Sequence, residues 1–236
     1  MGGEAREFPP TRWTLVFSTR GTPESGRAAF DELLKLYWKP LYFYARRKGL
    51  EVEAAKDAVQ GLFARLLEGD FSRNLDPEKG RFRGYLRASM DHHLANLHES
   101  RSALKRGGGA AILSLDCAGA ERELAAEPPS GAEPAYDREW AVGVMERSLT
   151  LLKAEFEGGA RRGPFDLFLR FFSADAAPSY EEAARGAGMT LSQLKSFLHR
   201  TRARFRGLVR SEVSRTLADP GDAESEIDTL ARALGP

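Results

Sequence analysis

The sequence has little cysteine and no long hydrophobic run. Its one cysteine, Cys117, excludes an intramolecular disulfide and a zinc site built on a CxxC pair. No stretch approaches the roughly 18 to 20 apolar residues of a membrane span. The first residues carry acids and prolines where a secretory signal needs an apolar stretch. We therefore expect a protein of the reducing cytoplasm without a membrane segment.

Net charge is also nearly absent, because 35 Lys and Arg residues face 34 Asp and Glu residues and leave +1 at pH 7. The two signs are segregated along the chain. Basic clusters lie at 46–48, 81–83, 101–106 and 195–210, whereas acidic residues gather at 116–137 and after residue 220. The near-neutral total is therefore a sum of opposed patches, which argues against a protein that coats DNA indiscriminately.

The alternation that is typical of strands is absent over any useful length, and apolar residues recur at helical spacing. The sequence therefore predicts an all-α fold. Helices are expected over 28–48, 52–67, 83–102, 140–156, 165–172 and 222–234, with Pro40 breaking or bending the first. Residues 107–137, rich in Gly, Ala, Pro and Glu, are interpreted as a flexible acidic linker between two small helical domains, residues 1–106 and 138–236.

Residues 179–210 have the pattern of two helices joined by a glycine turn. The capping-box pattern S/T-x-x-E/Q occurs at 179–182 and again at 190–193. Between the two boxes, Gly186 and Gly188 make a chain reversal inexpensive. This arrangement predicts a helix-turn-helix.

The second of these helices is expected to have one apolar face and one basic face. The apolar arc is formed by Leu194, Phe197, Leu198, Thr201, Phe205 and Leu208. The other side carries Gln193, Lys195, Ser196, His199, Arg200, Arg202 and Arg206. No Asp or Glu occurs from residue 193 through 211. We favour a helix that reads a DNA groove over a solvated amphipathic helix.

In its order of motifs the chain resembles the extracytoplasmic-function (group IV) sigma factors of bacterial RNA polymerase. The matching segments are YWKPLYFYARRKG, EAAKDAVQGLFARLL, DPEKGRFRGYLRASMDHHLANLHES, DREWAVGVMERSL and the helix-turn-helix. The resemblance implies a region 2 helical bundle and a region 4 helix-turn-helix joined by a linker. It also implies promoter recognition at −10 and −35 and transcription initiation together with core polymerase, without catalysis or a cofactor.

The resemblance assigns the −10 element to the first domain. Its contacts would be Arg81, Phe82, Arg83, Tyr85, Arg87, His92 and Asn96, which interleave cations and aromatic rings as single-stranded DNA requires. A core role for Phe82 and Tyr85 is the alternative. The −35 element would be read by Gln193, Lys195, Ser196, His199, Arg200, Arg202 and Arg206.

The resemblance also assigns partners. Asp57 and Gln60, one helical turn apart, would dock on the clamp helices of the largest polymerase subunit. This segment departs from the common pattern, because Gly61 stands where a Glu is usual. The acidic linker would run through basic polymerase channels, or serve only as a soluble spacer. Regulation by an anti-sigma factor or a kinase is compatible with the resemblance.

Other functions fit the residues less well. A zinc site on Asp91, His92, His93 and His98 lacks an i, i+4 His pair and a Cys partner, so no metal is expected. No GxSxG motif or phosphate-binding glycine loop supports an enzyme. A stand-alone helix-turn-helix regulator, or an inactive sigma-like decoy, is the main alternative. The tail after residue 219 is expected to pack on the second domain, with autoinhibition or dimerisation as alternatives.

Overall fold

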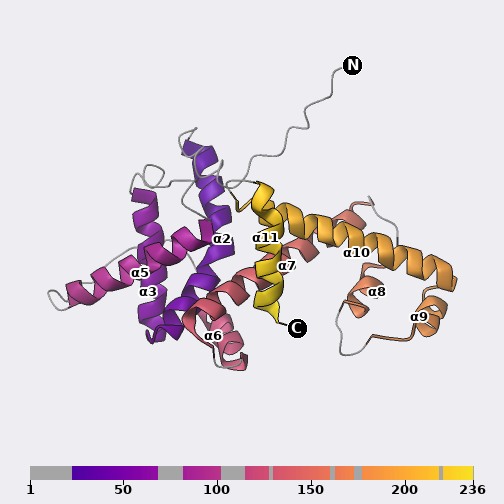
Figure 1. Cartoon of the computed structure of the whole chain (residues 1–236), viewed down its shortest axis with the longest axis horizontal. Coiled ribbons are helices and arrows are strands. Elements are labelled where there is room, and N and C mark those ends of the chain that lie inside the picture. Colours follow the sequence, from indigo (N-terminus) through magenta and orange to yellow (C-terminus); the bar gives the residue numbers. More distant parts are fainter. Residues whose placement is uncertain are drawn as a thin grey trace, which may run out of the picture. The chain divides into compact units, whose positions relative to one another are not determined.

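The computed structural model describes residues 23–68, 82–101, 115–127, 130–159, 163–172, 177–217 and 220–235. Every regular element within these residues is a helix, so the predicted all-α fold is confirmed (Figure 1). The helices are α2 (Pro23–Arg47), α3 (Val52–Glu68), α5 (Phe82–Arg101), α6 (Cys117–Ala126), α7 (Ala132–Glu157), α8 (Phe165–Arg170), α9 (Tyr180–Gly186), α10 (Leu191–Ser214), a 3-10 turn (Pro220–Asp222) and α11 (Ala223–Leu234). None of the described helices is both long and apolar enough to cross a membrane.

The chain divides into two compact units, and their boundaries differ from those predicted from the sequence. Unit 1 consists of residues 1–143 and 213–236, and unit 2 consists of residues 144–212. Unit 1 therefore holds the segment expected to be a linker and the C-terminal tail. The tail was expected to pack on the second domain, whereas α11 belongs to unit 1.

The expected flexible linker is helical where the structure describes it. Residues 117–126 form α6, and α7 begins at residue 132. The Asp116 carboxylate caps α6 by accepting a hydrogen bond from the Gly119 amide at 2.9 Å. Most of α6 consists of Ala, Glu, Arg and Leu, which are strong helix formers. The prediction of an extended segment was wrong here. It rested on the lack of hydrophobic periodicity and did not take into account the Asp116 cap or the helix propensity of residues 117–126.

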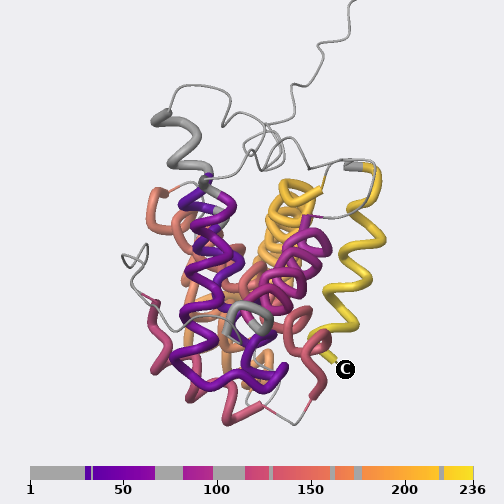
Figure 2. Tube along the Cα trace, turned by 90° about the vertical axis from the view of Figure 1, so that its left-hand side faces the viewer, coloured from indigo at the N-terminus to yellow at the C-terminus, as the bar shows by residue number. Residues whose placement is uncertain are grey.

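The core of unit 1 forms where α2, α3 and α5 pack against one another (Figure 2). The α2 segment Leu41–Ala45 is completely buried, and Phe30 meets Phe63 of α3 edge to face with 6.1 Å between ring centroids. Helix α2 continues through Pro40, which is buried, so the alternative of a break at this residue is wrong.

Close packing between α3 and α5 depends on Gly61. A Cβ atom at this position would lie 2.9 Å from Nε2 of His93, an α5 residue that is only 7% exposed. The absence of a side chain at Gly61 therefore makes room for the imidazole. Arg65 lies on the other side of the ring, with Nη1 3.2 Å from Nδ1 of His93. Burial lowers the pKa of His93, and the charge of Arg65 lowers this pKa further.

Unit 2 is held together by aromatic rings. Phe156 packs against Phe165 and Phe197, and Phe205 packs against Phe168 and Phe172, with ring centroids 5.1 to 6.2 Å apart. The predicted apolar arc of α10 is confirmed, because all its members are at most 7% exposed. This core fixes which side of α10 faces solvent.

The buried His93 predicts a pH dependence of stability. The pKa of His93 in the folded chain lies below the ordinary value of 6.5. Near and below about pH 6.5, the imidazole is therefore protonated to a greater extent in the unfolded chain than in the folded chain. The free energy of unfolding should fall on acidification from about pH 7.5 to about pH 5.5, by at most about 1.4 kcal/mol per pH unit from this residue. Urea unfolding followed by circular dichroism measures this.

The matched variants are His93→Gln and His92→Gln, the second at an exposed α5 position. The His93 variant should lose part of the pH dependence, and the His92 variant should keep it. Equal pH dependence in both variants would contradict the role given to His93.

Candidate nucleic-acid interface

The helix-turn-helix predicted for residues 179–210 is present as α9 and α10 in unit 2. Both predicted caps form. Ser179 accepts a hydrogen bond from the Glu182 amide at 3.2 Å. At the start of α10, Thr190 Oγ1 accepts from the Gln193 amide at 3.2 Å, and Gln193 Oε1 accepts from the Thr190 amide at 2.7 Å. Gly188, with φ +63°, occupies the left-handed region in the turn, where glycine pays no steric penalty.

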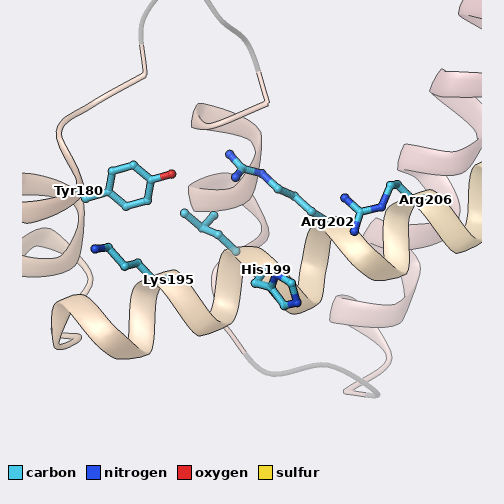
Figure 3. Close-up of a pocket in the computed structure, with 6 residues that line it drawn as sticks. Tyr180, Lys195, His199, Arg202 and Arg206 are labelled. Atoms are coloured by element: carbon cyan, nitrogen blue, oxygen red, sulfur yellow. The ribbon is translucent and has the colours of Figure 1, made fainter. Parts of the chain in front are cut away.

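A cationic groove runs along the solvent-facing side of α10. Its lining residues are Tyr180, Lys195, Leu198, His199, Arg202 and Arg206, and the hollow measures about 450 Å³. Figure 3 shows Tyr180 at the start of α9 beside the α10 stripe that carries Lys195 and Arg202. The four basic residues lie at spacings of four, three and four residues, so they share one face of the helix. All of them are exposed.

These side chains have no carboxylate partner among the described residues of unit 2, unlike their neighbour Arg204. The Arg204 guanidinium makes a bidentate pair with Glu155, with Nε 2.8 Å from Oε1 and 3.0 Å from Oε2. Lys195, Arg202 and Arg206 thus keep their charge available for an anion. A row of such cations with a tyrosine hydroxyl is suited to contact successive phosphates.

The other residues predicted to read −35 DNA lie beside this groove. Ser196 and Arg200 are exposed on the adjacent stripe of α10. Gln193 is exposed, but its side-chain oxygen is already used in the cap. Tyr180 was not predicted as part of this site, because the predicted basic face lay within the second helix alone. Its place as the first residue of α9, directly after the Ser179 cap, was the available signal.

The residues predicted to contact the −10 element are less accessible. Phe82 is 3% exposed and packs edge to face on Tyr37, with 5.3 Å between ring centroids. A base cannot reach such a ring, so Phe82 is a core residue in this structure, as the alternative had it. Tyr85 is half-buried and stacks on Phe82. Arg81 lies outside the described residues.

The remaining α5 residues fall into two groups. Arg83 and Arg87 are engaged in ion pairs with carboxylates of unit 1. His92 and Asn96 are exposed. The predicted −10 residues thus do not form one open surface.

The predicted polymerase contacts lie on α3, where Asp57 is exposed and Gln60 is half-buried. Among the described residues no group of three His, Cys, Asp or Glu side chains could hold a metal ion. Arg65 beside the His93 ring would repel a cation at this position. The His98 side chain lies outside the described part of the structure.

Comparison of the chain with protein-family models, curated proteins and solved structures gave no match.

The cap of α10 gives a direct test of the local structure. Thr190→Ala removes the hydroxyl that accepts the Gln193 amide and should lower the stability of unit 2 by about 1 kcal/mol. Thr190→Ser keeps the hydroxyl and should cost only a small part of this. Thermal unfolding of the two variants and the parent chain measures the difference. Identical melting temperatures for the Ala and Ser variants would show that the cap does not stabilise α10.

Proposed function

We propose that this chain is a promoter-recognition subunit of bacterial RNA polymerase, similar to extracytoplasmic-function sigma factors, acting in the cytoplasm without catalysis. The single observation that carries the proposal is the cationic groove of α10, whose basic residues have no carboxylate partner among the described residues. The order of motifs in the sequence narrows a general DNA-binding role to this class.

In this proposal α10 lies in the major groove at −35. Bases are read in the first half of a recognition helix, and cations farther along hold phosphates. Arg200 is exposed in this first half and can donate two hydrogen bonds to guanine. Arg206, at the far end of the groove, is assigned to phosphate.

In the same proposal, α3 contacts the clamp helices of the polymerase. Asp57 projects to solvent with Gln60 one turn later, an arrangement suited to an arginine-rich coiled coil. With Gly61 lacking the usual carboxylate, this contact is expected to be weaker than in the common pattern. The −10 role is assigned to α5 and requires Arg83 and Arg87 to leave their present partners.

A stand-alone helix-turn-helix regulator is the second candidate. It is favoured by one observation: the basic residues that line the α10 groove are exposed, whereas Lys39, Arg46, Arg83 and Arg87 are paired within unit 1. A regulator of this kind needs only duplex binding. A sigma-like decoy would bind core polymerase and fail to start transcription.

One experiment separates these candidates. The full chain is mixed with bacterial core polymerase and a promoter pool with randomised −10 and −35 elements, and bound DNA and transcripts are sequenced. A sigma factor co-purifies with core polymerase and yields transcripts from promoters with a shared pair of elements. A regulator selects duplexes without core polymerase, and a decoy co-purifies without transcripts. Failure to bind core polymerase or select any DNA contradicts both the proposal and its alternatives.

Substitutions on α10 test the assignment residue by residue. Arg200→Ala should lose about 1 to 3 kcal/mol of discrimination between the selected −35 duplex and a scrambled one. Arg206→Ala should weaken both duplexes alike and reduce the slope of log K against log salt by about 1. Fluorescence anisotropy over a salt series measures both effects.

Arg204→Ala is the matched control, because Arg204 is already paired with Glu155. It should change neither discrimination nor the salt slope. The assignment is wrong if Arg200→Ala and Arg206→Ala lose the same affinity on both duplexes.

A further inference from the structure

Five cations of α2 and α5 are paired with carboxylates that come later in the chain. The pairs are Lys39 with Glu123 and Glu139, Arg46 with Glu121, Arg47 with Glu127, Arg83 with Asp137 and Glu226, and Arg87 with Glu133. All of these residues belong to unit 1. The acidic segment once expected to be a free linker thus neutralises the basic residues of the first helices.

Arg83 is the most enclosed of these cations, with its side chain 11% exposed. Its guanidinium donates to both oxygens of Glu226 in α11 and to Asp137 in α7. The Trp140 ring lies beneath it, 5.0 Å from Cζ. Its backbone carbonyl accepts a hydrogen bond from the Tyr136 hydroxyl at 3.0 Å. A residue expected to contact −10 DNA is therefore covered by α7 and by the C-terminal helix.

Glu226 is a buried carboxylate that pairs with Arg83. It lies on the buried face of α11 with Ala223 and Leu230, and is 1% exposed. A carboxylate in such a position is costly unless a cation and hydrogen bonds compensate for the lost water. Two carboxylates on one guanidinium also leave a negative charge at this place, which repels a phosphate.

We propose that α11 is an autoinhibitory latch whose Glu226, together with Asp137, occupies Arg83 and closes the nucleic-acid surface of α5 until α11 is displaced. This inference rests on the proposed function, because it assigns regulation to the −10 surface. The carboxylates take the positions at Arg83 that DNA phosphates would otherwise fill. Nucleic acid can engage Arg83 only after α11 releases it.

The test uses the full chain with Glu226→Gln, which keeps the size of the side chain and removes its charge. Asp228→Asn on the same helix is the matched control, because Asp228 is exposed and the change in net charge is identical. The probe is a fluorescein-labelled single-stranded oligonucleotide of random sequence. Any binding by α10 is the same in both variants, so their difference reports on unit 1.

The latch predicts two changes in Glu226→Gln and neither in Asp228→Asn. Backbone amides of residues 223–234 should exchange with deuterium roughly tenfold faster, since a charge-assisted bond that holds α11 is lost. The oligonucleotide should bind roughly three- to tenfold more tightly, since the open form is more populated. The double variant Arg83→Gln/Glu226→Gln should keep the faster exchange and lose the tighter binding.

Two results would overturn the latch. If α11 exchanges equally in Glu226→Gln and Asp228→Asn, Glu226 does not hold the helix. If exchange rises and oligonucleotide binding does not, α11 covers no nucleic-acid surface. Both measurements omit polymerase, so a failure to initiate transcription contradicts the proposed sigma role and leaves this comparison intact.

Discussion

Charge pairing between the early helices of unit 1 and the acidic segments that follow them determines which cations of this unit stay accessible. The opposite charges that cancel in the near-zero net charge of the chain also meet in space. Carboxylates of α6, α7 and α11 form ion pairs with cations of α2 and α5. The basic residues of the α10 groove receive no such partner from the described part of unit 2. Under the proposed function, a polyanion that meets the folded chain is therefore directed to α10.

These ion pairs determine where the helices of unit 1 lie more than they add to the free energy of unfolding. Bringing Arg83 and Glu226 out of water costs about as much as their attraction returns, whereas leaving either one buried alone costs about 3 to 5 kcal/mol. The buried carboxylate thus specifies where α11 can lie. Unit 2 is organised differently, since packed phenylalanine rings form its core and the basic residues that line the α10 groove have no carboxylate partner among its described residues.

Local patterns in the sequence predicted local structure well. The extent of α3, the boxes at Ser179 and Thr190, and the buried arc of α10 all follow from spacing within a few residues. Contacts between distant segments were missed, because Glu226 and Arg83 are 143 positions apart and no periodicity relates them. The resemblance assigned Phe82 to the −10 element with a core role as the alternative, and its packing on Tyr37 supports the core role.

Under the proposed function, the folded chain offers nucleic acid exposed cations on α10 and paired cations on α5. Hydrogen exchange of the full chain with and without a duplex DNA of random sequence tests this most directly. We expect slower exchange in residues 191–206 on DNA binding, with residues 82–90 unchanged. Protection of residues 82–90 without protection of residues 191–206 would contradict it.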